Sequence, residues 1–137
     1  MRPTIRITGT KDIANRLDAM GKALRKQTLM PLVKEGLEPM ADEMRARAAR
    51  ESGQMANSVT VSEHLSPAQS AQNVPIAEVE AYAGPGPNPQ AIQEEFGNFR
   101  QSPRPFIRPA FDVHVDRALK HVARGGIDLV LKAAKKG

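Results

Sequence analysis

Three histidines are the first side chains to consider, because imidazole is a common proton carrier and metal ligand in proteins. His64 falls in a predicted strand or loop, whereas His114 and His121 are seven residues apart in a predicted C-terminal helix. Histidine pairs that share one metal ion on a helix are usually three or four residues apart. We therefore expect the helical pair to be partly exposed side chains, and we predict no metal site.

Paired carboxylates, a phosphate loop and an activated serine are the other catalytic patterns. Glu94 and Glu95 are adjacent, so on a helix they point about 100° apart and cannot easily flank one reacting atom. At least one of them should be structural. The turn at residues 84–89 lacks the lysine and the free backbone donors that a phosphate requires. Neither Ser52 nor Ser58 has a general base at a recognisable spacing, so we predict a protein that is not an enzyme and has no cofactor.

The composition is that of one ordinary domain without cysteine. The chain has 137 residues, of which 40% are hydrophobic and 26% charged, and we predict a single domain over residues 1–137. Disulfides, thiolate chemistry and cysteine-based zinc sites are excluded. Residues 1–6 lack the apolar stretch of a signal peptide, and no apolar run is long enough to span a bilayer. We expect a cytoplasmic product and no membrane partner.

The N-terminal part predicts a short strand and two helices. Residues 4–8 alternate polar with β-branched side chains, and Thr10 can cap a helix over residues 11–27. A second helix follows and ends near residues 51–53, with a bend or split expected near Pro39, which removes a backbone donor. The first helix carries one apolar stripe, which we interpret as core: Ile13, Leu17, Met20 and Leu24.

The middle of the chain predicts a β-hairpin. Residues 58–62 and 74–83 alternate as strands do, and small polar residues separate them. Residues 66–73 are too small and polar to pack, so we expect a flexible hairpin loop near 65–74.

The C-terminal part predicts a short helix and a long one. Residues 90–96 form the short helix, and three prolines hold residues 103–109 extended. The long helix could break at Gly125 and Gly126. We predict an α+β fold in which a small antiparallel sheet of three to four strands packs on two N-terminal helices and a long C-terminal helix.

Charge is distributed in three blocks. Residues 54–99 contain no Lys or Arg and five glutamates, both flanking segments have an excess of cations, and the net charge is +5. Opposite blocks could pair between neighbouring copies in a ring, or a basic surface could contact DNA. No helix-turn-helix, zinc-finger or basic-zipper pattern is present, which favours non-specific over sequence-specific contact. The candidate residues for DNA or inter-subunit contacts are Arg45, Arg47, Arg50, Arg100 and Arg104, to which Arg108 can be added.

Three short motifs occur in order: Ser52-Gly53-Gln54-Met55-Ala56-Asn57-Ser58-Val59, Glu95-Phe96-Gly97 and Pro105-Phe106-Ile107-Arg108-Pro109-Ala110. With the helices between them, they resemble the phage tail-component family of head-tail joining and tail-completion proteins, which includes minor tail protein Z-like sequences. The resemblance extends over nearly the whole chain. Ser52 stands where the family usually has Thr, and residues 66–73 have no counterpart in it.

The motif residues can also be given structural roles. Gly53 and Gly97 are expected to end helices in left-handed conformations, and Phe96 and Phe106 to be large anchors. Arg108 is expected to hydrogen-bond a carboxylate such as Glu95. The motif residues expected to serve the structure or an interface are Gly53, Ser58, Glu95, Phe96, Gly97, Pro105, Phe106, Arg108 and Pro109.

The resemblance implies a structural protein at the head-tail junction of a tailed-phage virion, assembled in the bacterial cytoplasm. It implies a homo-oligomeric ring, hexameric to match a sixfold tail tube, that binds neighbouring neck and tail proteins around the DNA channel. Exposed apolar side chains are then expected in the isolated protein, because a ring interface is buried only on assembly. The alternatives are a tail terminator or head-closure ring, a small basic DNA-binding protein and a toxin-like hydrolase.

Overall fold

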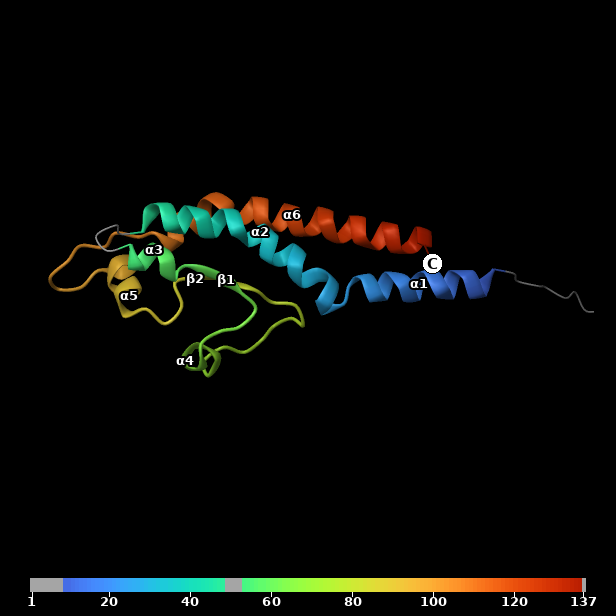
Figure 1. Ribbon diagram of the computed structural model, residues 1–137, viewed down its shortest axis with the longest axis horizontal. Coiled ribbons are helices and arrows are strands. Elements are labelled where there is room, and N and C mark those ends of the chain that lie inside the picture. Colours follow the sequence, from blue (N-terminus) through green and yellow to red (C-terminus); the bar gives the residue numbers. More distant parts are fainter. Residues whose placement is uncertain (1–8, 49–52, 137) are drawn as a thin grey trace, which may run out of the picture.

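The computed structural model describes residues 9–48 and 53–136 (Figure 1). They form an α+β fold, as predicted, in which helices dominate. The strand predicted at residues 4–8 lies outside the described residues. The second helix was predicted to end near residues 51–53, but it ends at Arg47, because Ala48 is extended with ψ of 150°. The elements are α1 (Thr10–Ala23), α2 (Lys26–Arg47), α3 (Gln54–Ser58), β1 (Thr60–Ser62), α4 (Pro67–Ser70), β2 (Tyr82–Gly84), α5 (Pro89–Phe96) and α6 (Ile107–Lys136).

Three long helices make the molecule elongated. α6 runs along most of its length, with α2 beside the first part of α6 and α1 beside the C-terminal part (Figure 1). Because α1 and α2 follow each other nearly end to end, both pack mainly on α6. The hairpin of β1 and β2 packs on α2, on the side away from α6.

The hydrophobic core lies where α2, α3, α5 and the start of α6 meet. Its largest fully buried side chains are Phe106, Met44 and Val59. Met40 and Met55 are buried beside them, and the flexible thioether side chain suits such irregular gaps. Phe106 is the one aromatic side chain in this core as far as the structure describes it, which agrees with the composition.

α1 contributes no buried residue to the fold. The interpretation of its apolar stripe as core is wrong, because Ile13 and Leu17 remain 58% and 61% exposed. α1 packs essentially on α6 alone, and one neighbouring helix covers only a narrow seam of an apolar stripe. Thr10 does not cap the helix either: Gly9 occupies the N-cap position with φ of 85°, and no side chain caps α1.

Neither the internal prolines of α2 nor the paired glycines of α6 interrupt their helices. α2 is continuous through Pro39, so it does not split, and it changes direction along its length (Figure 1). α6 is continuous through Gly125 and Gly126, so the predicted break is wrong. Packing of the two helices along each other compensates for their weak local propensity.

Gly125 lies against Leu32 of α2 in the contact between α2 and α6. A Cβ atom at Gly125 would lie only 2.4 Å from Cδ1 of Leu32 on α2. Gly36 has the matching position on α2, where a Cβ atom would lie 3.3 Å from side-chain atoms of His121 and Val122. At Gly126 the same atom would meet nothing within 4 Å. A side chain at position 125 would therefore displace Leu32 from its present packing on α6.

The sheet is smaller than predicted. β1 and β2 pair antiparallel with Val61 opposite Ala83, and they are the two strands within the described residues. Ser58, expected at the start of a strand, is the last residue of α3. Residues 74–81 were expected to be strand, but the Glu80 carboxylate accepts hydrogen bonds from the backbone N–H groups of Ile76 and Ala77. These local bonds replace ladder bonds.

The loop that joins the two strands contains local structure. Residues 67–70 form α4, and Ser66 and Gln69 make a reciprocal capping box at its N-terminus. Pro67 occupies the first turn, where its missing N–H costs nothing. The flexibility expected near residues 65–74 stays a prediction.

We predict opposite effects for alanine at the two adjacent glycines of α6. Gly126→Ala should raise the free energy of unfolding by up to about 1 kcal/mol, because alanine favours helix and the site is open. Gly125→Ala should lower it by about 1 kcal/mol, because the clash with Leu32 outweighs that gain. Urea denaturation followed by circular dichroism measures both. Equal stabilisation by the two variants would contradict the close approach of α2 and α6.

Candidate functional site

The carboxylate of Glu95 caps the N-terminus of α6. Its Oε2 accepts hydrogen bonds from the backbone N–H groups of Phe106 and Ile107, at 2.9 and 3.0 Å, and its Oε1 accepts one from Arg108 at 2.9 Å. Pro109, next in the chain, has no N–H to satisfy. One side chain and one proline thus account for the first donors that a helix leaves without partners. This arrangement explains why the two later motifs occur together.

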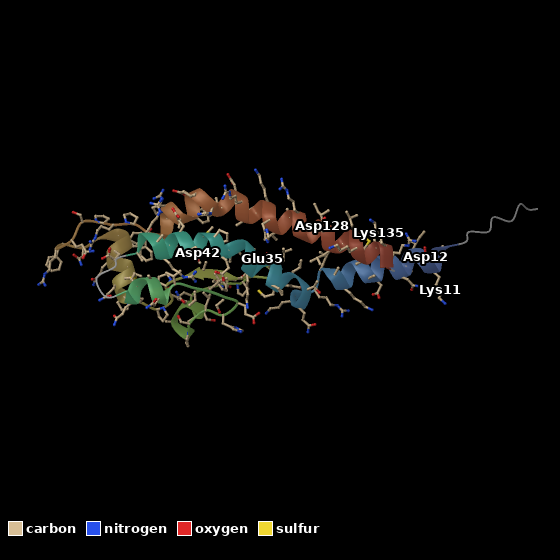
Figure 2. All side chains as sticks on the ribbon, turned by 45° about the horizontal axis from the view of Figure 1, so that its top comes forward. Lys11, Asp12, Glu35, Asp42, Asp128 and Lys135 are labelled. Atoms are coloured by element: carbon tan, nitrogen blue, oxygen red, sulfur yellow. The ribbon has the colours of Figure 1, made fainter. Side chains whose placement is uncertain are left out.

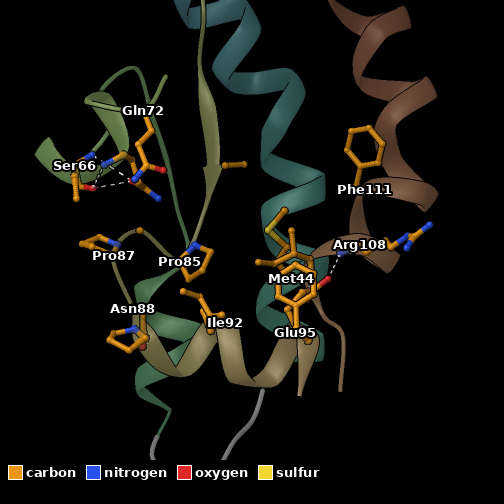
Figure 3. Close-up of a pocket in the computed structure, with 18 of the residues that line it drawn as sticks. Met44, Ser66, Gln72, Pro85, Pro87, Asn88, Ile92, Glu95, Arg108 and Phe111 are labelled. Carbon is orange, nitrogen blue, oxygen red and sulfur yellow. Dashed lines mark hydrogen bonds between the residues drawn. The ribbon is translucent and has the colours of Figure 1, made fainter. Parts of the chain in front are cut away.

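Glu95 and Arg108 do interact, but through different atoms than predicted. The backbone of Arg108 donates the hydrogen bond, and its guanidinium group points away from Glu95 (Figure 3). Partial burial raises the pKa of Glu95, but the hydrogen bonds from Ile107, Arg108 and Phe106, together with the positive charge of Arg108, outweigh it and leave the pKa below its ordinary value. Glu95 is therefore a charged cap at neutral pH.

Glu94 closes the loop between α5 and α6. Its Oε1 accepts hydrogen bonds from Arg104 Nη2 at 3.0 Å and from Gln101 Nε2 at 3.1 Å, and its carbonyl accepts one from the backbone N–H of Arg104 at 2.7 Å. Gly97 ends α5 with φ of 72°, and a Cβ atom there would lie 2.8 Å from the nitrogen of Pro103. Both neighbouring glutamates are therefore structural, and glycine is required at position 97.

The aromatic residues of the two later motifs have opposite environments. Phe106 is 1% exposed and fills the core, as expected for an anchor. Phe96 is 75% exposed, so it does not anchor the core, and its alternative role in an interface stays a prediction. Phe99 is 91% exposed, and the guanidinium carbon of Arg100 lies 5.0 Å from its ring centroid. Phe96, Phe99 and Arg100, here called the Phe-Phe-Arg group, are therefore exposed at the end of α5 and on the loop after it. Phenylalanine and arginine are enriched in protein interfaces.

The first motif joins α3 to the start of α5. Ser58 Oγ donates to the carbonyl of Met55 at 2.6 Å and accepts from Asn88 Nδ2 at 3.4 Å. Asn88 in turn caps α5 through the backbone N–H of Gln90. Gly53 has the predicted left-handed conformation, with φ of 72°, but it begins α3 instead of ending a helix.

Two of the candidate basic residues are occupied by internal contacts. The Arg45 guanidinium donates from Nε and Nη2 to the carbonyl of Val59, at 3.2 and 3.0 Å, and from Nη1 to Asp42 at 2.8 Å. Arg45 thereby fastens α2 to the start of the hairpin, as Arg104 fastens the α5–α6 loop.

The other candidate cations lie nearer the surface. Arg47 pairs with Glu43 one helical turn earlier, at 2.9 Å, and Arg100 lies on the exposed loop. Arg50 lies outside the described residues. A basic patch shared by these residues stays a prediction.

An open apolar groove of about 840 Å³ borders this junction (Figure 3). Met44 forms part of its floor, and residues 85–89, with three prolines, border it. Ile92 and Phe111 line it and are 64% and 50% exposed. The groove was not predicted from the sequence, although the proline run at residues 85–89 and an uncharged face of α5 could have indicated it.

No cluster of metal-binding groups is found in the described part of the chain. No three His, Asp or Glu side chains gather there as metal ligands. His114 and His121 lie in α6 and are partly exposed, as predicted, and His121 Nε2 is 3.7 Å from Glu35, too far for a hydrogen bond. Among the same residues, no helix has the length and apolar character to cross a membrane.

The fold and this site define a small helical structural protein whose motif residues build internal joints and leave apolar surface open. Comparison with known families matches residues 11–86 to the family described as "Bacteriophage HK97-gp10, putative tail-component". The match covers more than half of the chain, and the chain belongs to this family. The protein is therefore a bacteriophage tail component and a structural part of the virion. No curated protein and no solved structure matches the chain.

The matched residues include the first motif, Ser52 to Val59, and end before Glu95. They cover α1 to β2, so the family is defined on this chain by the two N-terminal helices and the hairpin. The membership expected from the motifs is confirmed.

We predict that Glu95→Gln lowers the free energy of unfolding by about 1–2 kcal/mol at neutral pH, the usual cost of a lost helix cap. Because the pKa of Glu95 is lowered by folding, its contribution is complete above the ordinary glutamate pKa of about 4.3 and is lost as pH falls through the folded-state pKa. The difference between wild type and variant should therefore shrink in acid. Thermal unfolding of both proteins at pH values from about 3 to about 7, on either side of that pKa, measures the difference in stability.

Glu78→Gln is the matched control, because Glu78 is exposed and makes no hydrogen bond or ion pair with the described residues. It should leave stability unchanged at every pH. A pH-independent loss in Glu95→Gln would contradict the role of the charge in the cap.

Proposed function

We propose that this protein is a head-tail joining or tail-completion component that forms a homo-oligomeric ring, most simply a hexamer, in the neck around the DNA channel. In this ring it binds copies of itself and neighbouring neck and tail proteins, and it works by shape and charge without catalysis. Its family membership supports work among other phage structural proteins.

One observation carries the proposal: the described residues expose more large hydrophobic side chains than they bury. They are exposed along α1, on the loop from Val74 to Ile76, around the groove and along α6. Monomeric proteins rarely leave apolar surface uncovered over so many elements. Such surfaces are buried when copies assemble, and an elongated subunit with apolar residues at both ends can contact two neighbours at once.

The charge distribution supports contacts between copies. Glu94 and Glu95 hold the α5–α6 junction, whereas Glu63, Glu78 and Glu80 lie on the hairpin, where Glu80 also orders the turn at Ile76. Among the cations of the two-helix end, Lys11 and Lys135 lie at the end of the molecule away from α5 (Figure 2). Opposite charges at separate places on one subunit favour contacts between unlike surfaces of two copies, as a ring requires.

The mass of the purified protein, followed by its location in intact particles, tests the proposal. A multiple of the subunit mass and density in the neck support it, and that density also distinguishes a tail terminator or a head-closure ring in an adjacent layer. A monomer that turns over a small molecule and is absent from finished particles would overturn it.

We predict that assembly weakens as salt concentration rises, because attraction between exposed charges is screened over about 8–10 Å at moderate ionic strength. Light scattering across a sodium chloride titration measures the mass. Glu78→Gln removes one exposed charge of the acidic block and should move the transition to lower salt. A mass that does not change over the titration would argue against charge pairing between copies.

We also predict weak DNA binding that is independent of sequence, since the sequence contains no recognised DNA-binding pattern but has an excess of cations. Fluorescence anisotropy with two unrelated duplexes should give equal affinities that fall with salt. Arg100→Gln, which removes an exposed cation at the end of the molecule, should weaken both equally. A strong preference for one duplex would favour a DNA-binding regulator over a ring component.

A further inference from the structure

The apolar stripe of α1 lies on a two-helix arm, which we define as α1 and residues 124–136 of α6 beside it (Figure 1). Three stripe residues, Ile13, Leu17 and Leu24, are 49–61% exposed although α1 packs on α6. On the α6 side of the arm, Ile127 and Leu131 are 59% and 54% exposed. Two helices bury one seam between them, so this arm lacks a third element to cover its apolar residues.

The charge of the arm makes a second arm an unfavourable cover. Residues 10–23 and 124–136 contain seven Lys and Arg against three Asp, a net charge of +4. Two of these cations are paired within α1, Arg16 with Asp12 at 3.2 Å and Lys22 with Asp18 at 3.0 Å. Lys11 and Lys135 lie toward the same end of the arm (Figure 2). Two arms packed side by side would therefore repel each other.

The hairpin has the complementary properties. Its residues 60–84 contain three glutamates and no Lys or Arg. Val74 and Ile76, on either side of Pro75, are 82% and 97% exposed, so they are among the least covered apolar side chains that the structure describes. The hairpin projects from the side of α2 opposite α6 (Figure 1).

Ile76 is exposed on a turn with a defined conformation. The Glu80 carboxylate accepts hydrogen bonds from the backbone N–H groups of Ile76 and Ala77, at 2.6 and 2.9 Å, and from the Tyr82 hydroxyl at 2.6 Å. Asn73 Nδ2 donates to the same hydroxyl at 3.3 Å. The bond from Tyr82, then those from Ala77 and Ile76, lower the pKa of Glu80, so it is charged at neutral pH. A turn ordered in advance loses less conformational entropy when it binds.

We propose that the hairpin of one copy docks on the arm of the next copy, with Val74 and Ile76 covering the exposed stripe around Leu17. Both surfaces are exposed within a single subunit, so neither covers the other there. Because the two surfaces differ, the contact is head to tail and can repeat until a ring closes. This inference rests on the proposed ring and names the pair of surfaces that build it.

Mixing two variants of the full chain tests the head-to-tail contact. Ile76→Ser removes the docking side chain of the hairpin and keeps the arm surface intact. Leu17→Ser alters the arm surface and keeps the hairpin intact. Each variant alone should weaken assembly by at least about tenfold in dissociation constant, as loss of a central apolar contact does. An equimolar mixture should form a dimer and nothing larger, because only one pair of intact surfaces remains in it.

Leu119→Ser is the matched control, since Leu119 is 64% exposed on α6 but lies outside the arm. It should assemble as wild type does. All three side chains are exposed, so circular dichroism and thermal unfolding should show native folds. A mixture that stays monomeric while wild type assembles would overturn the inference and leave the ring intact.

Cysteine cross-linking identifies the contact directly, because the chain contains no cysteine of its own. A mixture of Ile76→Cys and Leu17→Cys should give a mixed disulfide dimer on mild oxidation, whereas Ile76→Cys with Leu119→Cys should not. Efficient homodimers of Leu17→Cys alone would show arm-to-arm packing and overturn the inference. A wild type that is monomeric at every concentration and salt would instead overturn the proposed ring itself.

Discussion

The contact between α2 and α6 is the packing on which the rest of the structure depends. It is close because Gly36 and Gly125 each present no side chain to the facing helix. Continuity of both helices follows from it, since neither the proline in α2 nor the glycine pair in α6 favours a helix locally. The core around Met44 and Phe106 forms at one end of this contact, and the hairpin packs on the other side of α2.

Polar side chains fix the remaining elements to this pair of helices. Arg45 holds the chain at Val59, next to the start of the hairpin, and Glu95 sets the residue at which α6 begins. Glu94 and Arg104 close the loop between α5 and α6. Each joint uses a charged group with backbone partners or a well-placed counter-ion, and such bonds are stronger than neutral ones. Arg45 and Arg104, which were candidates for contacts with DNA or other subunits, thus make hydrogen bonds within the subunit.

The resulting subunit has a core at one end and an uncovered two-helix arm at the other. A tail component needs surfaces that match its neighbours. The ordered turn at Glu80, the exposed Phe-Phe-Arg group and the arm are exposed features that could serve as such surfaces. Some apolar side chains are therefore buried in the core of the subunit, and others stay exposed and available for contacts with neighbouring proteins.

The sequence by itself determined the long helices, the α+β class and the family, because helical periodicity and short motifs are local properties. It also indicated that Glu94 or Glu95 is structural and that Phe106 is a core residue. Only the tertiary structure decided which apolar stripe is buried, since periodicity shows that a helix has an apolar face and not what covers that face. The role of Gly125 was also decided by the tertiary structure. Its local propensity predicts a break in the helix, whereas in the fold its missing side chain leaves room for Leu32 of α2. Arg108 is a third example. Its side chain suggested a hydrogen bond to Glu95, but in the structure its backbone N–H donates that bond. Which groups meet across a long stretch of sequence depends on the path of the chain in space.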